Sequence, residues 1–353
     1  MISKDLLELL ACPRCRLPLD ASDNELACSA GHKYEVIDGI PILLLPEGEQ
    51  TLWVASASLN AGRLGAGDPD FVGTIGGATE ERAEIKRRFA NLHANGAGKI
   101  DPVVDVMVSQ TGGLLYRGVV GKLPRYPIPS LRLSAGAGTR LLDIGCGWGR
   151  WSAAAAGKGF SVVGLDPSLG AVAAARRVFA QLGQPGAFVV GDSRFLPFRP
   201  AAFGVVFSYS VFQHFSKAAA AASIGEAGRV LKPGGTSMIQ MPNALGIRSL
   251  QHQARRRFRT ARDFEVRYYL PSELTVLFEA AIGPTKLSVD GYFGLGIQPS
   301  DQDLLPFHYR MVVRASELLR SLRERIRPLV WFADSLYAVS TKRLAGPAEA
   351  SSG

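Results

Sequence analysis

The feature that most constrains the fold is the segment LLDIGCGWGRW (141–151), where a short apolar run leads into three glycines spaced one residue apart. Gly145, Gly147 and Gly149 allow a tight turn and the close approach of a ligand to the backbone. A helix starting near Arg150 would point its free N–H groups into the same space. A strand, a glycine-rich turn and a helix in this order are typical of nucleotide-binding, doubly wound sheets.

Short apolar runs alternate with helical stretches from this loop onward. We expect strands at 140–144, 161–166, 187–192, 203–210 and 236–241, and two further strands at 285–293 and 335–343. Alanine-rich helical segments separate several of the first five runs. The alternation predicts an α/β domain whose parallel sheet is covered by helices on both faces.

Acidic residues stand at or near the ends of three successive predicted strands. Asp166 lies about 20 residues past the glycine loop, where an acid binds ribose hydroxyls. Asp192 ends the third strand, and its carboxylate, with Ser193 and Arg194 behind it, can meet an adenine edge. Because the ends of parallel strands line one crevice, Asp143, Asp166 and Asp192 are predicted to converge on one adenosine-like ligand.

The acidity and the spacing of the loop narrow the kind of ligand. Asp143 at the mouth of the loop suits a ligand with a cationic amine and a sulfonium better than a pyrophosphate. The pattern is G-x-G-x-G, whereas dehydrogenases carry G-x-G-x-x-G. The alternative is a Rossmann domain that binds another nucleotide or has lost its ligand.

Five segments in order resemble the class I S-adenosylmethionine-dependent methyltransferases, with a core of the quinone-biosynthesis and small-molecule type. They are LLDIGCGWGRW, VVGLDPS, VVGDSRFLPF, FGVVFSYSVFQHF and EAGRVLKPGG. The resemblance implies a Rossmann-like, doubly wound seven-stranded sheet, the cofactor S-adenosylmethionine (SAM) and methyltransferase activity.

The resemblance also implies a set of cofactor-binding residues. Asp143, Gly145 and Gly147 approach the methionine part, and Cys146 lies in the same loop, where a small packed residue is expected. Asp166, followed by Pro167, takes the ribose, and Asp192 with Ser193 holds the adenine. Ser210 faces the sulfonium through its backbone, and Tyr116 is a candidate for closing the pocket or contacting the cofactor carboxylate.

His214, in VFQHF after the fourth strand, is the candidate catalytic residue. It stands near the point where the methyl group is expected to emerge, and a histidine can remove a proton from a hydroxyl or phenol acceptor. The alternative is a histidine that fills the pocket wall or hydrogen-bonds the backbone.

Cysteine spacing near the start predicts a metal-binding module. Cys12 and Cys15 form a C-x2-C pair, and Cys28 and His32 form a C-x3-H pair, which together suit tetrahedral Zn²⁺ in a structural site. A module this small gains stability from a metal. It resembles the small zinc-ribbon proteins that partner methyltransferases, and the C-x3-H pair is more similar to the ribbon of ribosomal-RNA guanine methyltransferases. Whether His32 is a ligand is left open, the alternative being three reduced cysteines and a surface histidine.

Composition divides the chain into five parts. We expect a zinc-ribbon-like module at 1–46, a flexible linker at 47–80, a helical or lid segment at 81–137, the methyltransferase domain at 138–343 with a basic helical insertion at about 295–333, and a disordered tail at 344–353. The sequence contains no run of about 18 apolar residues, so we expect no transmembrane helix. Its start lacks the pattern of a signal peptide. Three of four cysteines crowd into the first 28 residues, unlike a disulfide framework, so a cytoplasmic location is expected.

The acceptor is not encoded in these motifs. The net charge is +9, and arginines cluster at 248–262 and 314–328, either as solvated faces or as sites for RNA, an anionic membrane or a phosphorylated substrate. We favour a small-molecule or carrier-linked acceptor, because YSVFQHF stands where methyltransferases of base amino groups carry an N-P-P-[YF] motif. The alternatives are an RNA methyltransferase that uses the ribbon and arginine patches, and a non-catalytic adaptor. The accepting atom (O, C or N) and the oligomeric state are left open.

Overall fold

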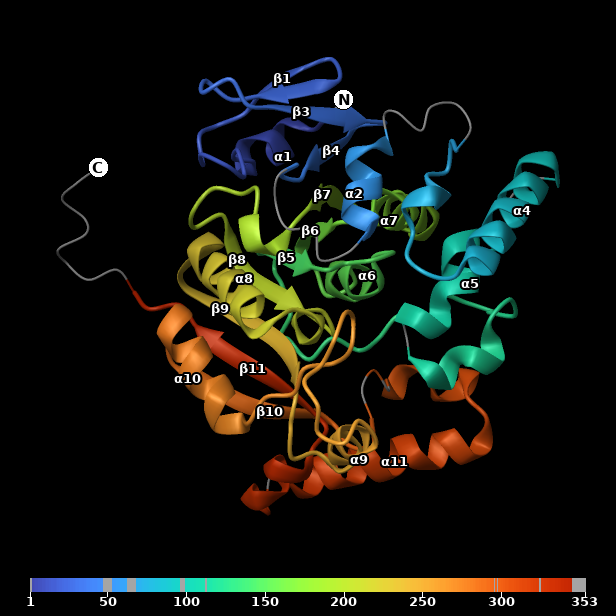
Figure 1. Cartoon of the computed structure of the whole chain (residues 1–353), viewed down its shortest axis with the longest axis vertical. Coiled ribbons are helices and arrows are strands. Elements are labelled where there is room, and N and C mark those ends of the chain that lie inside the picture. The colour runs from blue at the N-terminus through green and yellow to red at the C-terminus, as the bar shows by residue number, and fades with distance from the viewer. Residues whose placement is uncertain are drawn as a thin grey trace.

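A computed structural model describes residues 2–46, 53–61, 68–95, 99–111, 113–294, 296, 298–323 and 325–344 (Figure 1). The expected tail at 344–353 lies, except for Leu344, outside the described residues. No helix in these ranges is both long enough and apolar enough to span a bilayer. The expected cytoplasmic location stays a prediction.

One twisted sheet of eleven strands runs through the described chain in the order β1-β2-β3-β4-β7-β6-β5-β8-β9-β11-β10. Its central strands pair in parallel, with β5 (Arg140–Ile144) between β6 (Ser161–Asp166) and β8 (Phe203–Ser208). Next to them lie β7 (Ala187–Gly191) and β9 (Leu231–Pro242), also parallel. At the far edge, β11 (Ser335–Thr341) runs antiparallel to both β9 and β10 (Thr285–Gly291). All seven strands expected from the sequence are confirmed.

The expected number of seven strands is too small for the whole sheet, because the ribbon joins its edge. The ribbon has helix α1 (Lys4–Leu9) and strands β1 (Asp20–Ser22), β2 (Glu25–Ala27), β3 (Lys33–Ile37) and β4 (Ile40–Leu43). Strand β4 pairs in parallel with β7, with Ile42 opposite Val190 and Leu43 opposite Gly191. The ribbon is therefore built onto the edge of the large sheet (Figure 1).

Helices cover both faces of the sheet, as the alternating pattern predicts. On one face α6 (Arg150–Ala156) and α7 (Leu169–Leu182) bury side chains of β5, β6 and β7. On the other face α8 (Lys217–Val230), α10 (Pro271–Ala281) and α1 pack against the alternate side chains, including Leu142 and Ile144 of β5. Two-sided burial explains why the strands are apolar at most positions.

The segments between the ribbon and β5 form a helical layer beside α7. They comprise α2 (Trp53–Leu59), η2 (Val72–Thr74), α4 (Thr79–Asn95), α5 (Pro102–Thr111) and η3 (Leu114–Val119). The apolar side chains of η2, α4, α5 and η3 form a second core with Trp148, Ala174 and Val178, and Ala55 of α2 packs in the core around α7. The expected flexible linker at 47–80 thus contains two packed helices, α2 and η2, in its described part; residues 47–52 and 62–67 lie outside the described residues.

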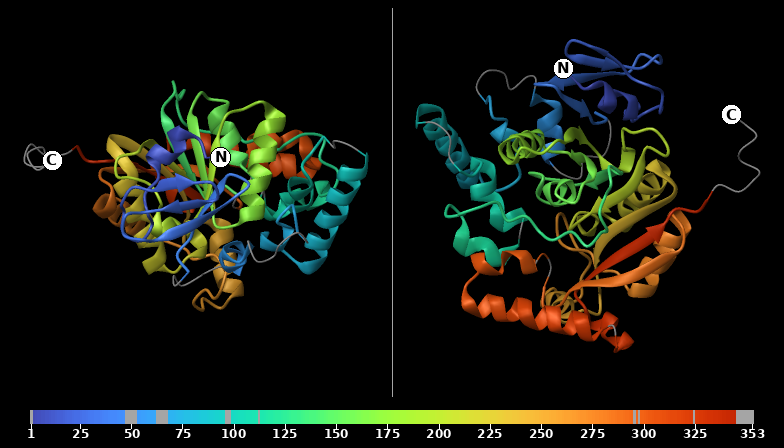
Figure 2. Two further views of the ribbon diagram at one scale, coloured as in Figure 1. Left: turned by 90° about the horizontal axis from the view of Figure 1, so that it is seen from above. Right: turned by 180° about the vertical axis from the view of Figure 1, so that it is seen from behind.

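The remaining elements lie after the sheet strands that carry the site. Short turns η4 (Ser193–Phe195) and η5 (Phe212–His214) follow β7 and β8, and helix α9 (Ile247–Arg255) follows β9. The basic insertion between β10 and β11 contains η6 (Pro299–Leu304), α11 (Phe307–Leu322) and η7 (Arg327–Phe332). It lies along one end of the molecule in both the front and rear views (Figures 1 and 2).

Candidate cofactor and acceptor site

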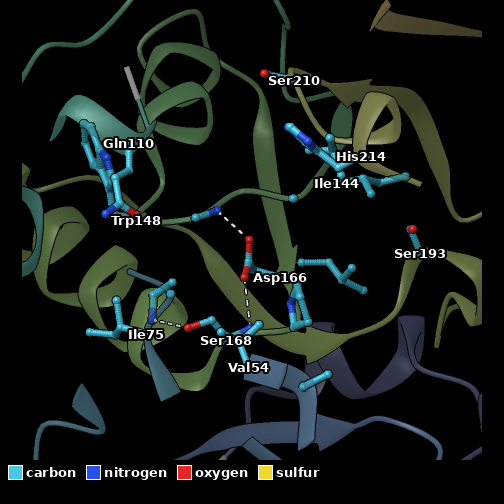
Figure 3. Close-up of a pocket in the computed structure, with 18 of the residues that line it drawn as sticks. Val54, Ile75, Gln110, Ile144, Trp148, Asp166, Ser168, Ser193, Ser210 and His214 are labelled. Atoms are coloured by element: carbon cyan, nitrogen blue, oxygen red, sulfur yellow. Dashed lines mark hydrogen bonds between the residues drawn. The ribbon is translucent and has the colours of Figure 1, made fainter. Parts of the chain in front are cut away.

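A cavity of about 470 Å³ lies at the carboxyl ends of β5, β6, β7 and β8 (Figure 3). Parallel strands end at the same edge of a sheet, so residues far apart in sequence meet there. Eight residues predicted from the sequence line it: Gly145, Gly147, Asp166, Pro167, Asp192, Ser193, Ser210 and His214. The structure therefore brings together most of the predicted cofactor site and the candidate catalytic histidine.

Asp166 ties the glycine loop to the end of β6. Its Oδ2 accepts a hydrogen bond from the Gly147 N–H at 3.0 Å, and its Oδ1 accepts one from the Ser168 N–H at 2.9 Å (Figure 3). Burial raises the pKa of Asp166 to about 6, and these two N–H donors oppose that rise. The carboxylate is thus ionised at neutral pH and sits at the wall of the cavity.

The glycine loop leaves room for a ligand against its backbone. Gly147 has a φ of +52°, and a Cβ at this position would meet no protein atom within 4 Å. A Cβ at Gly145, where φ is +73°, would overlap the Val211 side chain. Gly147 faces the open cavity, and Gly145 lets the loop pack closely against Val211 before η5. Both features fit a ligand that lies along the loop.

The charge of the cavity wall suits a cationic ligand. The described residues that line the cavity include two carboxylates, Asp166 and Asp192, and no lysine or arginine. Asp192 caps η4 by accepting from the Arg194 N–H at 2.8 Å, and its side chain pairs with the Arg194 guanidinium at 2.6 Å, so Asp166 is the main source of negative charge for a cationic ligand. Ser193 beside it is fixed by a 2.9 Å contact between its Oγ and that of Ser223. The residues present fit SAM, whose sulfonium and amine are positive and whose ribose and adenine need polar partners.

Two residues predicted to contact the cofactor lie beneath the loop instead. Asp143 is 1% exposed, and its Oδ2 accepts a hydrogen bond from Ser152 Oγ of α6 at 2.6 Å. Burial raises the pKa of Asp143 to about 7, and the Ser152 bond counteracts this. Cys146 is packed below the loop, where a Cβ on Gly164 would come within 2.9 Å of its Sγ. Neither residue lines the cavity: Asp143 orients α6, and Cys146 fills space beside β6.

Tyr116 also does not line the cavity. Its hydroxyl donates to Asp301 of η6 and accepts from Arg150 Nη2 at 3.0 Å. Arg150 Nη2 also pairs with Asp301 Oδ2 at 2.5 Å, and Arg150 Nε donates to the Pro127 carbonyl at 2.8 Å. All three side chains are buried. The predicted contact of Tyr116 with the cofactor is therefore replaced by a buried network that joins η3, the start of α6 and the insertion.

Ser210 is held in an unusual backbone conformation at the cavity wall. Its φ is +61°, a left-handed value that costs a residue with a side chain about 1 kcal/mol or more. Its N–H donates to Gln240 Oε1 at 2.8 Å, and its Oγ accepts from Gln213 Nε2 at 2.7 Å. Gln240, on β9, is a supporting residue that the sequence did not single out, because it stands inside an apolar strand.

His214 lies at the cavity wall in a defined protonation state (Figure 3). Its Nδ1 is 2.7 Å from the Phe264 carbonyl oxygen, which only accepts, so Nδ1 carries the proton. Its Nε2 lies 3.2 Å from Gln213 Nε2 and accepts from that amide. Burial lowers the pKa of His214 to about 4, and the ring stacks on Phe264 with centroids 3.8 Å apart. The imidazole is neutral near pH 7 and has its basic atom at Nε2.

The opposite wall comes from the segments before the methyltransferase sheet and was missed by sequence reasoning. Trp53, Ile75, Val103, Met107 and Gln110 line it. The two segments that carry Trp53 and Ile75 are held in place by hydrogen bonds to the start of α7. The Leu169 N–H donates to Ser58 Oγ at 2.9 Å, and the Gly170 N–H donates to Thr74 Oγ1 at 2.6 Å.

The ribbon carries a separate metal-type cluster. The ligand atoms of Cys12, Cys15, Cys28 and His32 all lie within 4.8 Å of one another. His32 Nδ1 is 3.5 Å from Cys12 Sγ and 3.4 Å from Cys28 Sγ, so His32 completes the predicted set. Three thiolates and one imidazole at these separations fit tetrahedral Zn²⁺ with a structural role. The Tyr34 hydroxyl, 3.1 Å from Cys12 Sγ, supports the ligand from outside.

Fold and site together define a domain of the SAM-dependent methyltransferase class joined to a zinc ribbon. Residues 141–235 match the family described as Methyltransferase domain, and residues 3–39 match the family described as Trm112p-like protein. The chain therefore contains a methyltransferase domain and an N-terminal Trm112p-like domain, with SAM and structural zinc as the groups that these domains hold.

Individual relatives match different parts of the chain. The biotin biosynthesis bifunctional protein BioHC of Cellvibrio japonicus is 29% identical over 67% of this chain, which spans 40% of that relative's length. A UPF0434 protein of Paraburkholderia phymatum is 43% identical over 17% of this chain and 92% of its own length. Among solved structures, a SAM-dependent methyltransferase from Methanosarcina mazei is 17% identical, with a TM-score of 0.42, covering 60% of this chain and 95% of that one.

Proposed function

We propose that this chain transfers a methyl group from SAM to a small-molecule or carrier-linked metabolite. The observation that carries the proposal is the continuity of the cavity. One cavity is lined both by the polar residues Asp166, Asp192 and Ser193 and by the apolar side chains of Trp53, Ile75, Met107, Trp148 and Phe264. A largely apolar cavity with a few polar groups is the usual form of a small-molecule site.

The chain's main task in this reaction is to position the reactants. When bound, SAM supplies a methyl group that is already reactive toward a nucleophile placed in line behind it. Asp166 and the loop at Gly147 hold the cofactor end, and the strained Ser210 backbone shapes the region between the two ends of the cavity. Fixing two reactants at near-attack distance supplies about 7–11 kcal/mol of the barrier. The buried side chains of Val103 and Met107 on the opposite wall exclude water from that side.

His214 is placed to receive the acceptor's proton. With a pKa lowered to about 4, the imidazole is too weak a base to ionise an ordinary hydroxyl before the reaction. An attacking hydroxyl becomes strongly acidic as its bond to the methyl carbon forms, so Nε2 takes the proton at that stage. Before then, the hydroxyl of the methyl acceptor donates a hydrogen bond to Nε2 and replaces the amide of Gln213 there. This bond orients the methyl acceptor.

The first test of this role compares His214→Ala with His308→Ala, which changes an exposed histidine on α11. We expect kcat to fall by about 10²-fold or more in His214→Ala, with an unchanged dissociation constant for SAM and no effect in His308→Ala. Equal turnover in both variants would remove His214 from the proton-transfer step.

The acceptor class is tested with radiolabelled SAM and fractionated cell extract. We expect the label to enter small solutes or carrier-linked metabolites. Label in RNA, together with RNA retention that falls steeply with salt, would instead establish the RNA alternative.

A further inference from the structure

Helix α9 attaches to the protein through its polar face and turns its apolar side chains to solvent. On the inner face, the Ser249 N–H donates to Asp334 Oδ1 at 2.8 Å, and Gln253 Nε2 donates to the Ala244 carbonyl at 2.8 Å. On the outer face, Ile247 is 46% exposed and Leu250 is 42% exposed. A surface helix of a globular protein normally has the opposite arrangement.

The segment after α9 extends this apolar surface. Arg257 and Phe258 both have left-handed backbone, with φ of 52° and 54°, and Phe258 is 69% exposed. Two consecutive residues of this kind cost about 2 kcal/mol of backbone strain, yet here they hold an aromatic ring in solvent. In the view from above, the chain between α9 and α10 projects from the body of the molecule (Figure 2).

Two further exposed aromatic residues lie beside the start of α9. Asn243 Nδ2 donates to the carbonyls of Trp331 and Ala333, each at 2.8 Å. These bonds fix the end of η7, with the half-exposed Trp331 and Phe332, to the segment that leads into α9. We use the term α9 face for the exposed apolar residues of α9, of the segment after it and of the adjoining η7, which are Ile247, Leu250, Phe258, Trp331 and Phe332.

The charge around the α9 face is strongly positive. Residues 247–262 include six arginines and no aspartate or glutamate. Glu265 pairs with Arg259 at 2.6 Å and lies 3.7 Å from Arg256. Within the described part of the chain, the guanidinium groups of Arg255, Arg257 and Arg262 have no acidic partner, which leaves an excess of positive charge beside exposed apolar groups.

We propose that the α9 face docks on an anionic phospholipid bilayer. A bilayer interface accepts aliphatic and aromatic side chains together, and anionic headgroups attract the flanking arginines. Tryptophan is favoured at such interfaces. Single-stranded RNA would use the arginines and stack on aromatic rings, but it offers no partner for the exposed aliphatic groups of Ile247 and Leu250.

Docking would bring the membrane close to the mouth of the cavity. The segment that begins at the C-terminal end of α9 continues to Phe264, which lines the cavity and stacks on His214. An acceptor with a lipid portion would then have a short path from the bilayer to Nε2 of His214. The docking itself does not depend on the identity of the acceptor or on the proposed reaction.

The test measures co-sedimentation of the full, zinc-loaded chain with vesicles. One set contains an equimolar mixture of phosphatidylglycerol and phosphatidylcholine, and the other contains phosphatidylcholine alone. We expect binding to the anionic vesicles, little binding to the neutral ones, and release when salt is raised from about 0.1 M to about 1 M. No binding to anionic vesicles at low salt, or equal binding to both sets, would overturn the proposal.

Paired variants separate the two contributions. Arg255→Gln/Arg257→Gln is expected to reduce partitioning about 25-fold, since each arginine near an anionic surface contributes about fivefold. Ile247→Ser/Leu250→Ser is expected to reduce it about tenfold. Matched controls are Val276→Ser, an exposed apolar residue on α10, and Lys232→Gln, an exposed cation at the start of β9.

All altered side chains are exposed, so melting temperature and SAM affinity should match the original chain in every variant. Vesicle binding that is unchanged in both α9 pairs would refute docking through this face. The bilayer proposal would also be overturned if the chain does not bind vesicles but binds poly(U) RNA in a salt-sensitive way that only the arginine pair weakens. That result would identify the surface as a nucleic-acid site.

Discussion

Removal of the Asp301 carboxylate should destabilise the protein far more than removal of its neighbour Asp303. The Asp301 side chain is fully buried and pairs at 2.5 Å with Arg150, whose side chain is 5% exposed. Asp301→Ala would leave this guanidinium buried without a counter-charge, at a cost of about 3–5 kcal/mol. Asp303 pairs with Arg125 at 2.6 Å, but its side chain is 64% exposed, so Asp303→Ala should cost about 0–1 kcal/mol.

Urea unfolding and thermal melting of the zinc-loaded chain measure this difference. For a chain of this size, about 4 kcal/mol corresponds to a fall of about 5 °C in melting temperature. The double variant Arg150→Met/Asp301→Leu should recover much of the loss, because it removes both charges and keeps the volume filled. Equal destabilisation by Asp301→Ala and Asp303→Ala would refute the view that the Tyr116–Arg150–Asp301 network fixes the insertion to the start of α6.

Three further perturbations test the cofactor site and the ribbon. Burial raises the pKa of Asp166 to about 6, and a cationic ligand favours the ionised carboxylate. The affinity for SAM, measured by calorimetry, should therefore be constant above pH 6 and fall below it by up to about tenfold per pH unit. In Asp166→Asn the affinity for SAM should be lower and should not change with pH over this range. His32→Ala should lower the zinc content found by metal analysis, and it should lower the melting temperature by about 5 °C or more. The reason is that metal binding stabilises the ribbon and its strand β4 on the edge of the sheet. An unchanged zinc content would exclude His32 as a ligand. Gly145→Ala should weaken SAM binding about tenfold, because the Cβ of the new alanine overlaps the Val211 side chain. Adding Val211→Ala should restore part of the affinity. If the affinity is not restored, backbone strain rather than the clash is responsible.

The sheet and the metal cluster follow directly from local sequence signals. The central predicted strands are short apolar runs that are buried on both faces in the structure, as at β5 and β6, whereas the edge strand β10 is only partly buried. The four metal-ligand positions were likewise predictable, because C-x2-C and C-x3-H pairs bring their side chains together through short turns. In both cases, information within a few residues was sufficient.

The opposite wall of the cavity was not predictable, because tertiary contacts determine its structure. Residues 47–80 contain many small residues and no clear hydrophobic periodicity, which favoured a linker. In the described part of this segment, Ser58 and Thr74 accept hydrogen bonds from the first turn of α7, more than 90 residues away. No local pattern in the sequence records such partners.

The orientation of side chains within a recognised motif was also not predictable. The motif placed Asp143 beside the glycine loop, but it did not reveal which face of β5 the carboxylate occupies. In the structure it faces α6 and Ser152, away from the cavity. Tyr116 also lies away from its predicted place at the cofactor, because its hydroxyl bonds to Asp301, which stands 185 residues later in the insertion.

The central claim is that the cavity at the ends of β5, β6, β7 and β8 holds SAM, and isothermal titration calorimetry of the zinc-loaded chain tests it most directly. SAM and its demethylated product should both bind with one site per chain, and Asp166→Ala should weaken both. Titrations at two temperatures are needed, because burial of apolar surface changes the binding enthalpy with temperature. Absence of heat with either compound at both temperatures would contradict the account.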